Sequence, residues 1–498
     1  MPLICLSLTA HTIDENLAVL DLYRGHVDLV ELRADYLDPS EKFRIRGFPG
    51  RAGLPAILTV RRKADGGVFE EGEGVRLVMI AKALAYASDN REANFAFVDL
   101  ESDFRVPAIE EACRIFGTKV IRSFHDPKGM PADLAAAWNS VSDNPEELPK
   151  LALACPSSHD FLRLYKFTEK LPKRDRVIVG MGDFGFPSRL LAARMGSFLS
   201  YSSAISAGLP GAAPGQLDPE DLVKTFRFRD IRASTEVYAL AGGKASIGAR
   251  SPQLHNSAFR SVGMDAVYFP IPTEDASTFL AILDMLGGKG AAVTIPHKES
   301  ILPFLAGLSP EAEAIGACNT LEKRSEGWFG HNTDAAGFES ALFEFMHRRD
   351  FAGLRATVIG AGGAAKAVAY ALARLGAACL VVNRSLPKAK ALAREYGFAW
   401  AANDERSAEL VADHADLIVN ATSVGMDGGT PGDPLEWYDF LGREAVFDLI
   451  YKPERTAFLQ RARTAGCHVV NGLPMLRYQA AEQFKIWTGG EPPSAYFE

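Results

Sequence analysis

The feature that most constrains this chain is a glycine-rich segment at residues 355–366, which reads Arg-Ala-Thr-Val-Ile-Gly-Ala-Gly-Gly-Ala-Ala-Lys. An apolar, strand-like run leads into the glycines, and an alanine-rich, helix-like run follows them. Glycines at this spacing permit a sharp turn and a close backbone approach to a pyrophosphate, which the first N–H groups of the helix attract. A second strand-like run, residues 378–384, follows at the distance that a βαβ unit requires. The segment therefore predicts a Rossmann-type dinucleotide site, and a purely structural glycine turn is the alternative.

The end of the second run bears on which dinucleotide binds. An acidic residue at this place would hold a ribose 2′-hydroxyl, whereas a cation would accept a 2′-phosphate. The chain has Asn383, Arg384 and Ser385 here, with Lys388 and Lys390 nearby. We therefore predict NADP(H) rather than NAD. If Arg384 is only a solvated loop residue, the choice stays open.

Length and composition restrict the class of protein. A chain of 498 residues with 47% hydrophobic residues and no apolar run of about 18 is expected to form two or three globular domains and not to enter a membrane. Six scattered cysteines without a CxxC pair indicate neither a disulfide framework nor a metal site. The strand-like run directly after Met1 leaves no space for a targeting peptide, so we expect the cytoplasm. A net charge of −8 with mixed signs argues against a nucleic-acid partner.

Short strand-like runs alternate with helix-like stretches before residue 220. They lie at residues 3–8, 28–32, 55–60, 95–100, 118–123, 150–154, 177–180 and 198–203. This number of units suggests a (β/α)₈ barrel, in which the C-terminal ends of the strands build the active site. Polar residues stand near these ends, namely Glu31, Arg33, Arg61, Glu101 and His125, and Lys150 begins the sixth run.

Lys150 opens the buried-looking run Lys-Leu-Ala-Leu-Ala. A lysine in such a strand is costly unless it is paired or functional, and desolvation would favour the neutral amine, a nucleophile toward ketones. On this local evidence, a strand-end lysine whose amine reaches solvent remains the alternative. His125 could likewise be an ordinary core or surface histidine.

Several segments of the first 220 residues together resemble the type I 3-dehydroquinate dehydratases. They are Glu31-Leu-Arg-Ala-Asp35, Thr59-Val-Arg61, Ser123-Phe-His-Asp126, Pro149-Lys150, Ser188-Arg189 and Ala213-Pro-Gly-Gln216. The resemblance implies a dehydration through an imine on Lys150, with His125 as general base and then general acid. Asp65 would orient His125, and Arg189 would bind the substrate carboxylate. The remaining substrate contacts implied are Glu31, Arg33, Arg61 and Gln216.

Two residues depart from that resemblance. Asp65 stands where relatives usually carry Glu, which shortens the acid by one methylene. Ala212 stands where relatives commonly have Ser beside the Pro-Gly-Gln loop, so one hydroxyl contact to substrate is missing.

From Val237 onward the chain resembles the shikimate dehydrogenases. The matching segments are Ser251-Pro-Gln-Leu-His-Asn256, Val293-Thr-Ile-Pro-His-Lys298, Gly316-Ala-Cys-Asn-Thr320, Gly330-His-Asn-Thr-Asp334, Gly360-Ala-Gly-Gly-Ala-Ala365, Asn383-Arg384, Asn420-Ala-Thr-Ser423, Asp448-Leu-Ile-Tyr451 and Gln479-Ala. The resemblance implies Lys298 as proton donor and Asp334 as the acid that orders it. It implies substrate contacts at Ser251, Thr294, Asn319, Tyr451 and Gln479. The implied cofactor contacts are Gly360, Ala361, Gly362, Gly363, Ala364, Asn383, Arg384, Ser385, Thr422 and Gly472.

One departure in this part concerns the substrate. Relatives usually show Ser-x-Ser-Pro, whereas this chain has Ala249-Arg250-Ser251-Pro252. A lost hydrogen bond to a charged group costs about 1.5–3 kcal/mol unless a group such as Arg250 compensates. A range shifted toward quinate, one live and one degraded domain, and a non-catalytic metabolite sensor are the alternatives to full bifunctional activity.

The sequence thus predicts an α/β protein of three parts. They are a (β/α)₈ dehydratase barrel at residues 1–225, a substrate-binding dehydrogenase domain at 236–335 with C-terminal helices at 472–498, and a Rossmann-type NADP-binding domain at 336–471. The expected partners are small molecules, and the oligomeric state stays open.

Overall fold

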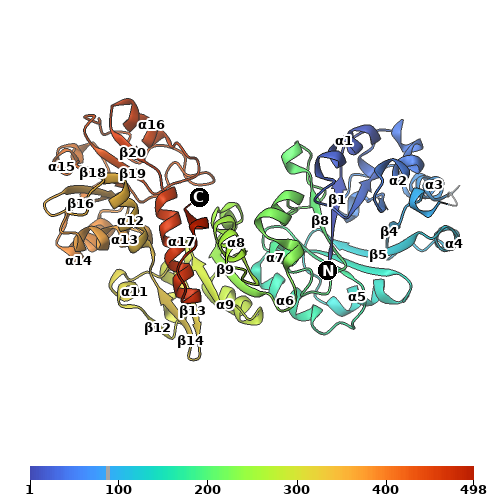
Figure 1. The fold of residues 1–498 in the computed structure, drawn as a ribbon. Helices are drawn as coiled ribbons and strands as arrows, with labels where there is room; N and C mark the ends of the chain where they lie inside the picture. Colours follow the sequence, from blue (N-terminus) through green and yellow to red (C-terminus); the bar gives the residue numbers. More distant parts are fainter. Residues whose placement is uncertain (86–89, 498) are drawn as a thin grey trace. The chain divides into compact units, whose positions relative to one another are not determined.

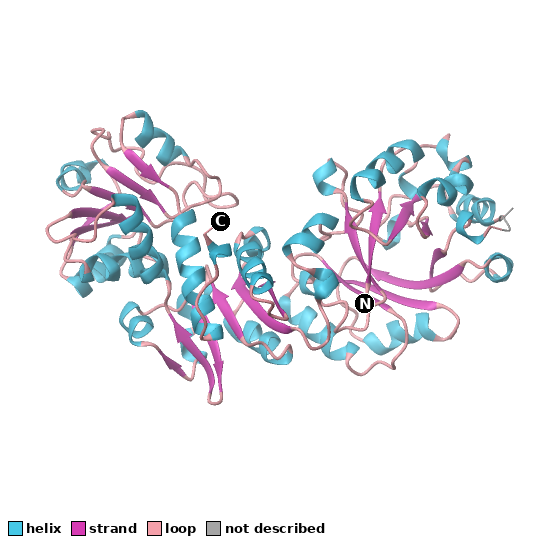
Figure 2. Cartoon of the chain, in the orientation of Figure 1, coloured by secondary structure: helices cyan, strands magenta, loops and turns pink. Residues whose placement is uncertain are grey.

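The computed structural model describes residues 1–85 and 90–497. The chain divides into two compact units, one of residues 1–236, 265–274 and 278–285, and the other of the remaining residues. Three sheets follow one another along the chain, and Figures 1 and 2 show their strands and covering helices. In the described ranges, no helix is long and apolar enough to cross a membrane.

The first sheet is a parallel barrel, as predicted (Figure 1). Its strands are β1 (Leu3–Leu8), β2 (Leu29–Arg33), β3 (Ala56–Thr59), β4 (Phe97–Glu101), β5 (Lys119–Asp126), β6 (Leu148–Ala154), β7 (Val177–Met181) and β8 (Leu199–Ser203). Their order is β7-β6-β5-β4-β3-β2-β1-β8, and a parallel bridge between Arg176 and Ser197 links the two outer strands. The helices of this part are α1 (Ile13–Tyr23), α2 (Phe48–Ala52), α3 (Glu73–Leu84), α4 (Pro107–Phe116), α5 (Leu134–Ser142), α6 (Ser158–Thr168) and α7 (Phe186–Leu190).

The barrel interior explains how a lysine can lie inside a strand. Side chains alternate along β6, so Lys150 shares a face with Leu148 and Ala152, which belong to a buried apolar cluster. The sequence placed Lys150 at the start of its strand, but the strand begins two residues earlier. Lys150 is therefore surrounded by barrel on both sides, paired in register with Ser123 of β5 and Val177 of β7.

The second sheet is mixed. Its strands are β9 (Glu236–Gly242), β10 (Ala266–Pro272), β11 (Gly290–Val293), β12 (Gly307–Leu308), β13 (Thr320–Arg324) and β14 (Gly327–His331), in the order β10-β9-β11-β13-β14-β12. The helices between and after them are α8 (Ser251–Ser261), α9 (Ala276–Met285), α10 (His297–Ser300), α11 (Pro310–Ile315) and α12 (Asp334–Met346). The β11–β13 and β13–β14 pairs are antiparallel, whereas β9–β11 is parallel.

The third sheet confirms the Rossmann-type prediction. Its strands are β15 (Arg355–Ile359), β16 (Ala378–Asn383), β17 (Ala399–Ala402), β18 (Leu417–Asn420), β19 (Ala445–Asp448) and β20 (His468–Val470). The helices are α13 (Gly363–Arg374), α14 (Leu386–Tyr396), α15 (Ala408–Asp413) and α16 (Ala457–Thr464). The strands lie in the order β17-β16-β15-β18-β19-β20, and every neighbouring pair is parallel. From β15 the chain first adds strands on one side of the sheet and then, from β18, on the other. Doubly wound sheets bind ligands at this switch between β15 and β18.

The C-terminal helix α17 (Leu473–Thr488) packs back on the second sheet. The Gln483 amide donates to Thr320 Oγ1 (3.0 Å), and the Trp487 indole donates to the Leu321 carbonyl (2.9 Å). His255 of α8 lies between Tyr496 Oη (2.7 Å) and Gln483 Oε1 (3.1 Å). These contacts join the C-terminal helix and the turn at Tyr496 to the second sheet and to α8.

We expect His255 to make stability depend on pH. Burial lowers the pKa of His255 to about 3. An unfolded histidine has a pKa of about 6.5, so below that pH the unfolded chain binds a proton that the folded chain does not, and stability falls by about 1.4 kcal/mol per pH unit. From pH 7 to pH 5 this residue should remove about 2 kcal/mol, measurable by urea unfolding.

The His255→Asn variant should lose this part of the pH dependence. His347→Asn is the control, because His347 is exposed at the end of α12. Equal pH dependence in both variants would show that other groups are responsible.

Candidate active sites

The amine of Lys150 is buried against an acid and a phenol. Its Nζ lies 2.7 Å from Asp99 Oδ2 and 3.1 Å from Tyr201 Oη. The Tyr201 ring centroid is 4.4 Å away. A lysine side chain with 6% exposure needs such partners, because an unpaired ammonium is strongly disfavoured inside a protein. The predicted functional lysine therefore has a specific environment.

Arg61 is joined to the lysine through the same acid. Its Nη2 lies 2.6 Å from Asp99 Oδ1, and its Nη1 lies 2.5 Å from Glu101 Oε1. Burial alone would raise the pKa of Asp99, but the charges of Arg61 and Lys150 hold that pKa well below its usual range. The structure thus brings Arg61 to the site with both of its terminal nitrogens paired to carboxylates.

His125, near the end of β5, is held as a neutral base. Burial and the positive charges of Arg61 and Lys150 hold the pKa of His125 well below 6.5, although Asp99 opposes them. Its Nδ1 is buried and has no hydrogen-bond partner in the described part of the chain. At neutral pH the imidazole is therefore in the unprotonated form that a general base requires, with one ring nitrogen unused.

Asp65 does not contact His125 in this structure. Its Oδ2 accepts from Arg62 Nε at 2.6 Å, and Arg62 also binds Asp103. Asp65 is one methylene shorter than the glutamate that relatives usually carry. It lies on the 3₁₀ turn after Arg62, within reach of the Arg62 guanidinium. The orienting role of Asp65 therefore stays a prediction that no contact of the present geometry supports.

Two further predicted residues are held by neighbours at the barrel end. Glu31 accepts from Ser7 Oγ (2.7 Å) and Thr59 Oγ1 (2.8 Å). Arg33 makes two hydrogen bonds to Asp35 (2.9 and 2.7 Å), and its Nη1 donates to the Ala212 carbonyl (3.1 Å). Arg33 thereby anchors the loop that carries Ala212.

Arg189 has unused capacity for an anion. Its Nη2 donates to the Pro214 carbonyl (2.9 Å), and its buried Nε has no partner among the described residues. Burial lowers the pKa of Arg189 to about 10, so the guanidinium stays charged at neutral pH. A buried cation without a carboxylate partner is suited to a substrate carboxylate.

Gln216 lies on the loop that Arg189 contacts, and it is hydrogen-bonded to Ser203. Its Oε1 accepts from Ser203 Oγ and from the Ala213 amide (3.1 Å), and the Ala212 amide donates to the same Ser203 hydroxyl (3.3 Å). The Ser203 hydroxyl thus lies next to Ala212, the position at which relatives commonly carry a serine.

The sequence reasoning did not single out Asp99, Ser123 or Tyr201 as functional. Asp99 carried a usable signal, because an acid inside the apolar strand Phe97–Glu101 requires a buried partner. Tyr201 carried none, since a tyrosine in a strand is ordinary.

The predicted pair of the second site is formed. Lys298 Nζ lies 2.5 Å from Asp334 Oδ2, with both side chains mostly buried. Asp334 begins α12, where the helix N-terminus favours a carboxylate. Its other oxygen accepts from Asn319 Nδ2 (2.8 Å), which also reaches Gln479 Oε1 (3.3 Å). The structure therefore joins four predicted residues in one network.

The other predicted substrate contacts lie at strand and helix ends. Thr294 directly follows β11, and Ser251 begins α8. Burial raises the pKa of Tyr451, while the Arg250 backbone N–H and its charge act in the opposite direction. The Tyr451 hydroxyl therefore lies beside the segment that carries Ala249.

The turn after β15 is built for close approach of a ligand. Gly360 has φ +118°, and a Cβ there would lie 3.1 Å from the Ala421 carbonyl oxygen. At Gly362, which caps α13, a Cβ would meet no protein atom within 4 Å, so the space in front of the helix is open. A Cβ at Gly363 would lie 3.3 Å from the Lys298 side chain, which places this turn next to the lysine.

The remaining cofactor candidates surround the same edge. Asn383 ends β16 and donates to the Ser385 carbonyl (3.1 Å), and Arg384 follows exposed. Thr422 Oγ1 donates to Asn420 Oδ1 (2.7 Å). At Gly472 a Cβ would lie 2.0 Å from the Leu449 oxygen, so only glycine fits. Within the described ranges, no cluster of three metal-binding side chains occurs.

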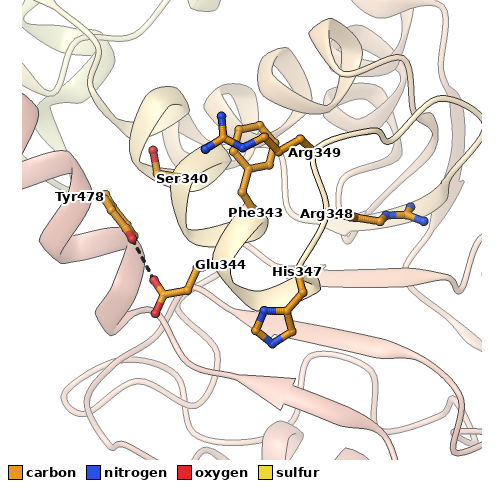
Figure 3. Close-up of a pocket in the computed structure, with 7 residues that line it drawn as sticks. All are labelled: Ser340, Phe343, Glu344, His347, Arg348, Arg349 and Tyr478. Atoms are coloured by element: carbon orange, nitrogen blue, oxygen red, sulfur yellow. Dashed lines mark hydrogen bonds between the residues drawn. The ribbon is translucent and has the colours of Figure 1, made fainter.

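A separate pocket of about 430 Å³ lies along α12 and α17 (Figure 3). It is lined by Ser340, Phe343, Glu344, His347, Arg348, Arg349 and Tyr478, whose charged ends point in different directions. Glu344 accepts from Tyr478 Oη at 3.0 Å. This bond ties the helix that begins at Asp334 to the helix that carries Gln479.

Four family models match successive segments of the chain. Residues 4–233 match type I 3-dehydroquinase, and residues 243–321 match the shikimate dehydrogenase substrate binding domain. Residues 344–425 match shikimate/quinate 5-dehydrogenase, and residues 472–498 match the shikimate 5′-dehydrogenase C-terminal domain.

Individual relatives agree with these families. The chain is 30% identical over 99% of its length to a chloroplastic bifunctional 3-dehydroquinate dehydratase/shikimate dehydrogenase from Arabidopsis thaliana, covering 83% of that protein. It is 41% identical to an NADP(+) shikimate dehydrogenase from Moorella thermoacetica, over 54% of this chain and 93% of that one. A solved shikimate 5-dehydrogenase from Thermus thermophilus, in complex with NADP(H) and shikimate, is 36% identical over 52% of this chain and 97% of that one, with a TM-score of 0.45.

The two glycines of the turn should respond differently to substitution. Gly360→Ala forces a side chain into positive φ, which costs about 1–3 kcal/mol, so both the melting temperature and NADPH affinity should fall. Gly362→Ala has room in the protein, so the melting temperature should hold while the added methyl obstructs the nucleotide and weakens binding. Thermal melts and NADPH fluorescence titration check both, and unchanged affinity in Gly362→Ala would contradict a nucleotide at this turn.

Proposed function

Because the chain belongs to the family that joins a type I 3-dehydroquinate dehydratase to a shikimate dehydrogenase, we propose how its own residues divide the two reactions. The chain dehydrates 3-dehydroquinate to 3-dehydroshikimate and reduces that product to shikimate with NADPH. The observation that carries the assignment of residues is the environment of two lysines. Lys150 is buried and Lys298 is mostly buried, and each amine lies within 2.7 Å of a carboxylate.

In the dehydratase, Lys150 condenses with the ring ketone and releases water, and the iminium withdraws electrons from the neighbouring C–H bond. His125 accepts the proton from that carbon because its imidazole is neutral. It then returns a proton to the departing hydroxyl, which leaves as water. Hydrolysis of the imine frees the product and Lys150.

The roles of the substrate-binding residues in the barrel follow from which of them have hydrogen-bonding groups that are not already paired within the protein. Arg189 binds the carboxylate, supported by its buried donor without a partner among the described residues. Gln216 and Glu31 hold hydroxyls at the barrel end. Arg33 and Arg61 act mainly by positioning Asp35 and Asp99, which departs from the hydroxyl contacts predicted for them.

The dehydrogenase half fits NADP(H). The open space before Gly362 and the positive φ of Gly360 support a pyrophosphate site at this turn, and Arg384, which is exposed, would bind the 2′-phosphate. Gly363, Ala361 and Ala364 complete the turn. Ser385 and Asn383 would contact the adenosine side of the bound cofactor, and Thr422 and Gly472 would contact its nicotinamide. NADPH, when bound, supplies the hydride that reduces the ketone.

Lys298 donates the proton that the forming alkoxide needs, and its charge stabilises that oxygen. Asp334 orients Lys298, and Asn319 holds both Asp334 and a ring hydroxyl. Ser251, Thr294, Tyr451 and Gln479 bind the rest of the substrate. Ala249 leaves one contact to the carboxylate missing.

We propose domain limits at residues 1–225, 236–335 with 472–498, and 336–471, which agree with the three sheets and α17. We also propose that the protein is located in the cytoplasm. The six cysteines, all buried and free, support this location. The partners of both sites are small-molecule substrates.

Each lysine should control one reaction only. Lys150→Ala should abolish the enone-forming dehydration and the borohydride-trapped adduct, while NADPH-dependent reduction of 3-dehydroshikimate continues. Lys298→Ala should lower the reduction about 10²–10⁴-fold and leave dehydration intact. Both are measured by enone and NADPH absorbance. Loss of both activities in either variant would contradict independent sites.

Restoring the missing hydroxyl tests the substrate. Ala249→Ser should lower the KM for 3-dehydroshikimate about tenfold or more, because a hydrogen bond to a carboxylate returns. Ser251→Ala is the matched opposite and should raise that KM. An Ala249→Ser variant with unchanged KM, together with faster wild-type oxidation of quinate than of shikimate, would instead favour a quinate-directed enzyme.

A further inference from the structure

The carboxylate of Asp99 bridges the two cations of the barrel interior. Its side chain is fully buried on β4. Oδ2 lies 2.7 Å from Lys150 Nζ, and Oδ1 lies 2.6 Å from Arg61 Nη2 and accepts from Ser123 Oγ at 2.5 Å. Both oxygens are therefore in use before any substrate arrives.

Asp99 is poorly suited to act as a base. Arg61 and Lys150 outweigh the effect of burial and hold the pKa of Asp99 well below its usual range. A carboxylate of such low basicity does not take a proton from an ammonium. Its contribution must come from its position and its fixed negative charge.

The charge at the lysine nitrogen is the same before and after condensation. The ammonium R–NH₃⁺ and the ketone O=C give R–NH⁺=C and one water, so two hydrogens leave the nitrogen with the ketone oxygen. One N–H and one positive charge remain on the nitrogen. A carboxylate fixed beside that atom can therefore accept a hydrogen bond from both states.

We propose that Asp99 is a positioning residue and counter-ion for the Lys150 nitrogen throughout the dehydration, and that Arg61 acts on Lys150 through Asp99. This inference rests on the imine role of Lys150 in the proposed function. It assigns Asp99 a role that the motif residues of the barrel do not cover.

Other groups around the nitrogen do not replace Asp99. The ionisable side chains that act on Lys150 or on its partners are Cys5, Glu31, Arg61, His125 and Tyr201. Burial holds the pKa of the Tyr201 phenol well above 10, so that phenol is neutral. Glu31 is bound to Ser7 and Thr59, and no contact joins it to Lys150 in the described ranges.

The test is the pH profile of borohydride trapping with 3-dehydroquinate, followed by intact mass. Asp99→Asn removes the charge that favours the ammonium, so the profile should move to lower pH by about one unit or more, and the trapped adduct should decrease. Arg61→Gln removes the opposing cation and should move the profile to higher pH. Opposite displacements are not expected from a merely structural role.

Three further measurements serve as controls. Asp99→Glu keeps the charge and should keep the wild-type profile while trapping more slowly. Tyr201→Phe removes an uncharged contact and should displace the profile by less than Asp99→Asn does. Reduction of 3-dehydroshikimate by the same preparations reports that each variant is folded.

The outcomes distinguish failure of the proposed Asp99 role from failure of the imine role of Lys150. If Asp99→Asn and Arg61→Gln both retain the wild-type profile, the inference is overturned. If Asp99→Asn does not fold, absence of an upward displacement in Arg61→Gln overturns it alone. If the wild-type chain forms no adduct on Lys150, the proposed imine role fails first, and the inference fails with it.

Discussion

Pairing of buried charge is the constraint on which the barrel depends. Each buried ion costs several kcal/mol to desolvate, and only close partners with satisfied hydrogen bonds offset that cost. Arg61, Asp99, Glu101 and Lys150 meet this condition as an alternating array across β3 to β6. Because each member depends on its neighbours, the position of the reactive nitrogen is determined by the whole array. The Lys150 amine is thereby held inside the barrel and away from solvent.

The same rule organises the dehydrogenase part with different elements. Lys298 and Asp334 belong to two separate sequence motifs, and their side chains meet in the folded chain. Asn319 donates to both Asp334 and Gln479 and so joins the pair to α17. The helix that carries Gln479 is tied to α12 by the hydrogen bond between Tyr478 and Glu344, as Figure 3 shows. A hydrogen-bonded network of this kind holds the Lys298 amine in place through side chains from several elements.

Departures from the family pattern have different consequences in the structure. Ala212 lies beside Ser203, whose hydroxyl is in hydrogen-bond contact with the Ala212 amide. Asp65 is bound to Arg62 and not to His125. At Ala249 the side-chain hydroxyl that relatives usually carry is missing, and the Tyr451 hydroxyl lies beside the same segment. Covalent linkage of the two enzymes raises the local concentration of the shared intermediate, so a weaker contact at Ala249 bears on how much of it is captured.

The sequence by itself determined the fold class, because strand and helix periods and the glycine turn at Gly360 are local properties. It also singled out Lys150 and Lys298 as candidate reactive residues, through motifs that resemble those of the two families. Only the tertiary structure decided what these lysines contact. Asp99 and Tyr201 reach Lys150 from β4 and β8 because barrel closure brings distant strands together, and no local pattern records that proximity. The motif predicts a substrate contact for Arg61, and only the structure shows that its guanidinium is paired with Asp99 and Glu101.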